Sequence, residues 1–95
     1  MKQGECMKIK QGFRLKKENE QYVIVCDKTI NRNFNSSIIL TDTSAFLWEL
    51  AKKGKASKEE MLNGLLENFN ISTVLALNDI DVFIKILKEN GILEE

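Results

Sequence analysis

Residues 35–50 read NSSIILTDTSAFLWEL and connect a short apolar strand directly to an amphipathic helix. The strand is residues 37–40, in which three large aliphatic residues follow a serine. The junction, residues 41–44, consists of side chains whose oxygen atoms can cap the N-terminus of a helix. Strand patterns precede this stretch and helix patterns follow it, so it marks the passage from a sheet to a helical layer.

The sequence before this stretch predicts two more strands. Residues 13–16 (FRLK) alternate between apolar and basic side chains, which is the period of a half-buried strand. Residues 21–27 (QYVIVCD) are rich in β-branched and aromatic side chains and are apolar on both faces, as expected of a central strand. With residues 34–40 as the third strand, the links between consecutive strands predict an antiparallel meander whose third strand is an edge.

This third strand lacks the features that normally protect the edge of a sheet. Edge strands usually carry lysine, proline or another charge that prevents pairing with a second chain. Residues 35–40 contain none of these. Such an edge is either covered by a helix of the same domain or left free for a partner, and the pattern leaves both alternatives open.

Three helices are predicted after the strands. The first spans residues 44–53, and its Trp48 lies off the main apolar stripe and is expected to pack against the sheet. The second begins at Ser57 with a capping box, because Glu60 stands three residues after the capping serine. The third spans residues 77–90 and stops at Gly91. The stripes expected to be buried are Phe46, Leu47, Leu50 and Ala51 in the first helix, Leu62, Leu65, Leu66 and Phe69 in the second, and Leu77, Ile80, Phe83, Ile84 and Leu87 in the third.

The third predicted helix is apolar on a second face, which holds Val82 and Ile86. Either this helix is wedged between the sheet and the other helices, or its second face is the wall of a groove. Three strands followed by three helices predict an α+β domain, a three-stranded antiparallel sheet followed by a three-helix bundle, similar to a winged helix-turn-helix. We expect residues 1–8 to form a frayed N-terminal tail and residues 9–95 a single domain.

The composition argues against several classes of function. Fourteen basic and fourteen acidic residues cancel, which disfavours nucleic acid as a partner because phosphates attract basic domains. The chain has no histidine, so it lacks the base of a Ser-His-Asp or Cys-His site. Cys6 and Cys26 are expected to be free thiols, and no metal or cofactor is expected. No apolar run suits a membrane span or a signal peptide, which favours a cytoplasmic location.

Catalysis is not expected either. The close carboxylate pairs are Glu59 with Glu60 and Asp79 with Asp81. The first pair belongs to a helix cap and the second to the first turn of the third predicted helix, where negative charge suits the helix dipole. The chain has no glycine-rich phosphate loop and no dinucleotide fingerprint. We therefore predict a protein that is not an enzyme.

An ordered set of motifs resembles the PqqD family, the small proteins of pyrroloquinoline quinone synthesis and their relatives, also called RiPP recognition elements. No single motif is specific, but the order and spacing are, and they cover about residues 8–93. This sequence departs where many relatives have Asn at the position of Thr41 and Gly near Ser36 or Ser37. The motifs are residues 12–15 (GFRL), 22–25 (YVIV), 40–50 (LTDTSAFLWEL), Gly54, 57–60 (SKEE), Phe69, 79–84 (DIDVFI), Leu87, Gly91, Ile92 and Leu93.

The resemblance implies a peptide-binding chaperone. Family members bind the leader region of a ribosomally made precursor peptide and present it to a tailoring enzyme, often a radical SAM enzyme. The leader adds as a further strand to the third strand, in a cleft walled by the third helix. Carried onto this sequence, the peptide-binding residues are Ser36, Ser37, Ile38, Ile39, Leu40, Asp81, Val82, Lys85, Ile86 and Lys88.

Three alternatives to this interpretation remain. The first is a winged-helix DNA-binding regulator, although Asp79, Asp81 and Glu89 offset Lys85 and Lys88 on the third helix. The second is a purely structural subunit of a modifying enzyme. A homodimer through the edge strand would compete with the peptide for one surface. The sequence also leaves open whether the N–H of Ile39 or that of Ile38 faces the free edge.

Overall fold

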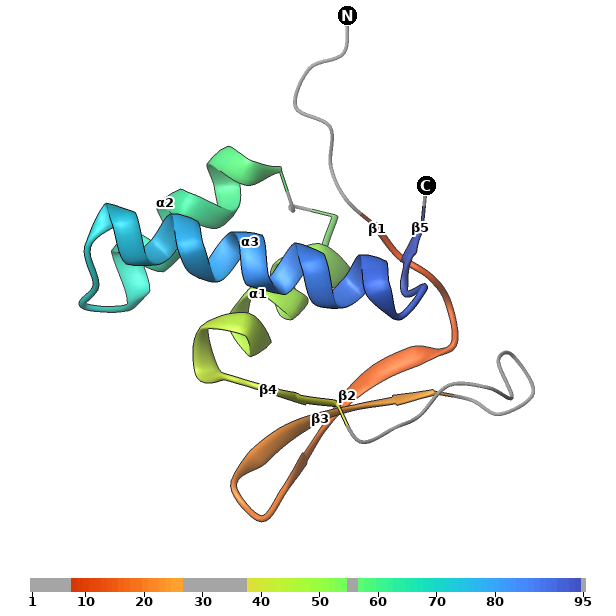
Figure 1. Cartoon of the computed structure of the whole chain (residues 1–95). Coiled ribbons are helices and arrows are strands. Elements are labelled where there is room, and N and C mark those ends of the chain that lie inside the picture. The colour runs from red at the N-terminus through yellow and green to blue at the C-terminus, as the bar shows by residue number, and fades with distance from the viewer. Residues whose placement is uncertain (1–7, 27–37, 55–56, 95) are drawn as a thin grey trace, which may run out of the picture.

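A computed structural model describes residues 8–26, 38–54 and 57–94 (Figure 1). Three strands precede three helices, and a further two-residue strand lies near each end of the described chain. The elements are β1 (Lys8–Ile9), β2 (Phe13–Glu18), β3 (Gln21–Cys26), β4 (Ile38–Leu40), α1 (Asp42–Lys52), α2 (Lys58–Asn68), α3 (Thr73–Glu89) and β5 (Leu93–Glu94). The predicted α+β order of an antiparallel three-stranded sheet followed by three helices is confirmed.

The main sheet has the order β2-β3-β4, and both strand pairs are antiparallel. β2 and β3 are joined by a two-residue turn, Asn19 and Glu20, whose φ angles are 52° and 65°. Positive φ at both central residues defines the type I′ turn, whose twist matches that of a hairpin. The strand predicted at residues 13–16 therefore continues to Glu18. β4 is the edge, as predicted, and residues 34–37 of the predicted third strand lie outside the described residues.

α1 begins two residues earlier than predicted because Thr41 is its N-cap. The Ser44 N–H donates to Thr41 Oγ1 at 3.2 Å, and the Ala45 N–H donates to the Thr41 carbonyl at 2.8 Å. Trp48 is 1% exposed and belongs to the same cluster as residues of the sheet, which confirms that it packs there. Phe46 and Leu50, predicted on the buried stripe, are only half-buried, because the buried face of the helix is Ser44, Ala45, Leu47, Trp48 and Ala51.

α2 has the predicted capping box. The Glu60 N–H donates to Ser57 Oγ at 3.1 Å, and Ser57 Oγ donates to the Glu60 carboxylate at 3.2 Å. The prediction that Leu66 is buried is wrong, since it is 39% exposed and Met61 is buried in its place. The reason is close packing against α1: a Cβ added to Gly64 would lie 2.8 Å from Cε2 of Phe46, so the Gly64 side of α2 is turned toward that helix.

α3 begins four residues before the predicted start. Ser72 caps it, accepting the Leu75 N–H at 3.2 Å. The helix ends as predicted at Gly91, whose φ of 67° is accessible to glycine at little cost. The prediction that Leu77 is buried is wrong, since it is 46% exposed, and Ile84 is only half-buried. One added turn brings Ala76 onto the buried face, which is Ala76, Ile80, Phe83 and Leu87.

A second, two-stranded ladder was not predicted. Lys8 pairs with Glu94 and Ile9 with Leu93, and the Lys10 N–H donates to the Ile92 carbonyl at 2.8 Å. Lys8 is therefore part of a strand, whereas residues 1–7 of the predicted tail lie outside the described residues. Strands of two residues are too short to show a period in the sequence.

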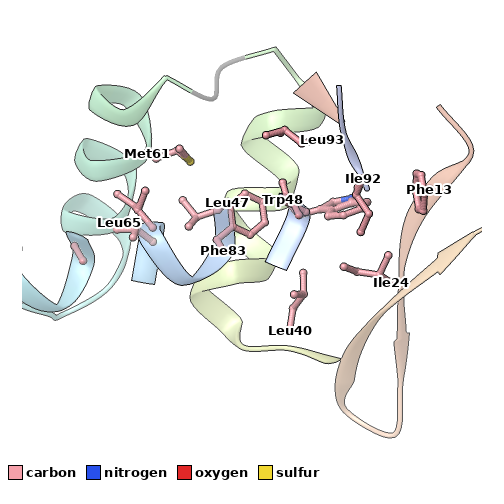
Figure 2. Close-up of a cluster of buried hydrophobic side chains, with 13 residues drawn as sticks. Phe13, Ile24, Leu40, Leu47, Trp48, Met61, Leu65, Phe83, Ile92 and Leu93 are labelled. Atoms are coloured by element: carbon pink, nitrogen blue, oxygen red, sulfur yellow. The ribbon is translucent and has the colours of Figure 1, made fainter. Parts of the chain in front are cut away.

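The core lies between the sheet and the helices (Figure 2). Phe13 and Ile24 from the sheet, Trp48 of α1 and Phe83 of α3 point into one cluster, and Ile92 closes it with no exposed surface. Helices therefore cover one face of the sheet only (Figure 1). In the described part of the chain, no helix is long and apolar enough to cross a membrane.

Candidate functional site

The length of the β2–β3 turn determines which backbone N–H and C=O groups point away from the sheet at its edge. In a hairpin with a two-residue turn, the residues that flank the turn exchange both backbone hydrogen bonds, so Glu18 and Gln21 form such a pair. Bonded and non-bonded pairs alternate along an antiparallel ladder. Val23 therefore bonds to β2, whereas Tyr22 and Ile24 direct their N–H and C=O groups toward β4.

This alternation decides which groups of β4 are free. Leu40 lies opposite Tyr22 and Ile38 opposite Ile24, so these two residues of β4 bond to β3. Ile39, opposite Val23, must then direct both its N–H and its C=O away from the sheet. The alternative that the sequence left open is thus resolved in favour of Ile39. The edge ends at Thr41, whose carbonyl already accepts the Ala45 N–H at 2.8 Å.

The side chains of β4 alternate between the two faces of the sheet. Leu40 is 4% exposed and points into the core, toward the helices (Figure 2). Ile38 shares that face and is half-buried, while Ile39 is 53% exposed on the opposite face. The edge thus offers the free N–H and C=O of Ile39. Beside them, on the face toward the helices, lies the partly exposed side chain of Ile38.

The second apolar face of α3 is present in the structure. Val82 is 45% exposed and Ile86 is half-buried, and the helical period places Leu75, Asp79, Val82 and Ile86 on one side of α3. The buried side of α3 shares the core cluster with Leu40 of β4. β4 and α3 therefore pack on the same core. β4 has unpaired backbone groups at Ile39, and α3 has a partly exposed apolar face at Val82 and Ile86.

The predicted charged site residues lie within about 60° of one another, on a side of α3 that adjoins the Val82 face. Lys85 is exposed and lies about 60° around the helix from Val82, whereas Asp81 and Lys88 lie about 100–120° away. Within the described part of the chain, these three side chains have no ion-pair or hydrogen-bond partner. Lys85 is therefore the charged side chain best placed beside the Val82 face. Ser36 and Ser37, also predicted as site residues, lie outside the described residues.

The acidic residues and the pocket of the described chain bear on whether it could hold a metal ion or perform acid–base chemistry. The described residues contain no group of three or more His, Cys, Asp or Glu residues placed to hold a metal ion. Asp79 and Asp81 are two positions apart on a helix and so point about 160° from each other, which prevents them from acting as a pair. A pocket near the C-terminal end of α1 includes none of the β4 or α3 site residues, being lined by Lys8, Ile9, Lys10, Gln11, Ala51, Lys52 and Gly54.

Two solved structures share this fold. The first is described as "Lasso peptide synthetase B1 complexed with the leader peptide" and has a TM-score of 0.71, 18% identity, and coverage of 96% of this chain and 100% of that chain. The second is described as "TbiB1 in Complex with the TbiA(beta) Leader Peptide", with a TM-score of 0.69, 18% identity, and coverage of 92% and 94%. At this identity the likeness establishes the fold alone.

The sequence itself matches the model of a known protein family. No curated protein matches the chain. The model of the family described as coenzyme PQQ synthesis protein D (PqqD) matches residues 27–93, well over half of the sequence. The matched segment contains β4, α1, α2 and α3, the elements that form the edge and the apolar helix face. The chain belongs to the PqqD family.

Proposed function

We propose that this protein is a non-catalytic chaperone that binds the leader region of a ribosomally made precursor peptide and delivers it to a tailoring enzyme. The observation that carries the proposal is the unpaired backbone of Ile39 at an edge that bears no charge or proline. The leader adds there as a fourth strand, and the apolar face of α3 receives its side chains. The protein acts in the cytoplasm, and the tailoring enzyme is of the radical SAM or a related class.

The relatives support this proposal. Both structural neighbours are described as complexes with leader peptides. The family match covers the elements on which the bound peptide would lie. An added strand alternates its side chains between the two faces of the sheet. Every second leader residue would therefore face Ile38, Val82 and Ile86, which favours apolar residues at those leader positions.

Backbone bonds at Ile39 can supply only part of the affinity for the leader. Within the described edge, Ile39 supplies one donor and one acceptor, and each backbone bond contributes about 0.5–1.5 kcal/mol net. A micromolar complex needs about 8 kcal/mol. Burial of one large apolar side chain contributes about 1.5–3 kcal/mol. Most of the affinity must therefore come from leader side chains packed on α3, while the backbone bonds fix direction and register.

An NMR titration tests the proposal. Isotope-labelled protein is titrated with the leader segment of the precursor peptide encoded beside it. We expect shift changes concentrated in β4 and along the Val82–Ile86 side of α3. A well-dispersed spectrum without changes in those two elements would refute leader binding at this site.

The other functions have less support. As a DNA-recognition helix, α3 would carry three acidic side chains and two lysines, an unfavourable balance beside phosphates. A purely structural subunit would not need an unpaired edge. A homodimer through β4 would use the same Ile39 groups as the leader, so leader addition should dissociate it.

A further inference from the structure

Exposed apolar side chains gather in one part of the molecule outside the peptide site. Four of the six large apolar residues that are exposed in the described chain lie between residues 66 and 77. Leu75 lies on the same side of α3 as Val82 and so adjoins the peptide site. The remaining three are Leu66, which is 39% exposed, Val74, which is 76% exposed, and Leu77, which is 46% exposed. We call these three residues the α2–α3 patch.

The members of this patch lie near the connection between the two helices. Only residues 69–72 separate α2 from α3, and both helices pack into the same core. Leu66 lies in the last turn of α2, and Val74 and Leu77 lie in the first two turns of α3 on adjacent turns of one side. Around the helix from Val82, Leu77 lies at about 140° and Val74 at about 80°, and Val74 is also about 12 Å away along the axis, so the patch adjoins but does not coincide with the Val82 face.

The charged residues nearest to the patch along the chain are acidic. Between residues 59 and 84 the chain has five carboxylates and no lysine or arginine: Glu59, Glu60, Glu67, Asp79 and Asp81. Glu67 follows Leu66 directly, and Asp81 lies one turn beyond Leu77 on the same side of α3. Both carboxylates are exposed, and neither forms an ion pair within the described residues. The segment that carries the patch is thus acidic, although Lys58 and Lys85 flank it and the whole chain has a net charge of zero.

The exposed apolar patch and the acidic residues beside it indicate what kind of partner would bind there. An exposed apolar patch rimmed by polar groups is typical of a protein-binding site. An acidic rim repels nucleic acid and attracts a basic protein surface. A second copy in a symmetric dimer would bring two acidic rims together. A head-to-tail copy would offer the basic residues 8–17, but no exposed large apolar residue lies in that described segment, and such contacts form open chains.

We propose that the tailoring enzyme docks on the α2–α3 patch through an apolar surface with a basic rim. That the docked protein is this enzyme rests on the proposed function, whereas the position of the site does not. The two partners occupy separate surfaces. The enzyme binds Leu66, Val74 and Leu77, and the leader binds β4 and the Val82 side of α3. The protein therefore holds both at once, and the enzyme does not displace the leader that it receives.

Variants of the patch and of the peptide site, compared with each other, test the proposal. The probes are the purified tailoring enzyme and the leader peptide encoded beside this protein, each titrated against wild type, V74K/L77K and the matched control V82K. All three substitutions replace exposed side chains, and circular dichroism verifies the fold. V74K/L77K should weaken enzyme binding by about tenfold or more and change leader affinity less than twofold. V82K should do the reverse, and enzyme affinity should fall as salt is raised.

Each outcome has a distinct meaning. Unchanged enzyme affinity in V74K/L77K, or no enzyme binding by folded wild type, overturns the docking proposal and leaves leader binding standing. Normal leader affinity in V82K instead contradicts the proposed peptide site and leaves enzyme docking to be judged by V74K/L77K alone. Light scattering provides a further check: a wild-type dimer that V74K/L77K dissociates would show that the patch binds a second copy, which also overturns the proposal.

Discussion

Replacing Ile39 by proline removes the one backbone donor that the described β4 edge offers to a partner. Ile39 does not bond to β3, and its side chain is 53% exposed, so the substitution breaks no ladder bond and opens no cavity in the core. Proline is accepted on the open side of an edge strand. We therefore expect I39P to fold, with a melting temperature within a few degrees of wild type, since about 1 kcal/mol corresponds to about 4–8 °C in a domain of this size.

In I39P, the affinity for the leader should decrease much more than the free energy of unfolding. The loss of one backbone bond removes about 0.5–1.5 kcal/mol, and the leader carbonyl that accepted it is left beside an apolar ring, which costs about 1–3 kcal/mol if water cannot reach it. The sum, about 1.5–4.5 kcal/mol, predicts a decrease in affinity of about tenfold to about a thousandfold, since 1.4 kcal/mol is a factor of ten. Fluorescence anisotropy with a labelled leader measures this decrease.

Ile38→Pro is the matched control. Its N–H bonds to Ile24 of β3, so proline at this position removes a ladder bond and should lower the melting temperature clearly more than I39P. If I39P unfolds while I38P stays folded, the backbone alternation deduced from the two-residue turn is wrong. If both variants fold and bind the leader as wild type does, strand addition at β4 is refuted.

Three further predictions concern stability, each measured by thermal or denaturant unfolding. Leu87→Ala should cost about 2–5 kcal/mol because Leu87 has no exposed surface, and a loss below 1 kcal/mol would contradict its place in the core. Ser72→Ala should cost about 1 kcal/mol because its hydroxyl caps α3, and Ser72→Asp, which retains the cap, should restore stability. Gly91→Ala should cost about 1–2 kcal/mol because φ there is 67°, whereas Gly91→Asn should cost less.

Sequence patterns predicted the order of the elements well. The period of two in β2, the apolar run in β3 and the capping box at Ser57 each depend on residues close in sequence, and all three are confirmed. The errors concern which side of a helix is buried. Leu66 and Leu77 fit an apolar stripe, but packing of Gly64 against Phe46 turns α2, and the cap at Ser72 adds a turn to α3. Packing of one helix against another leaves no local signal, whereas the Ser72 cap is a local feature that the predicted helix start at residue 77 missed.

The candidate site was predictable in part. The unprotected edge was visible in the sequence, and so was the second apolar face at Val82 and Ile86. The free backbone of Ile39 was not, because it follows from a turn twenty residues earlier whose length fixes the alternation along β3 and then β4. The α2–α3 patch was missed because its three residues were assigned to the core or given no role.

The pairing of β1 with β5 has a consequence for how this domain can be joined to others. Lys8 and Glu94 face each other across an antiparallel ladder, in which opposite Cα atoms are about 5 Å apart. The two ends of the described chain, Lys8 and Glu94, therefore lie next to each other. A unit of this shape can be spliced into a surface turn of a larger protein without separating the two sides of that turn. It can equally be cut open elsewhere and rejoined between Lys8 and Glu94 by a short linker, with β4 and the α2–α3 patch unchanged.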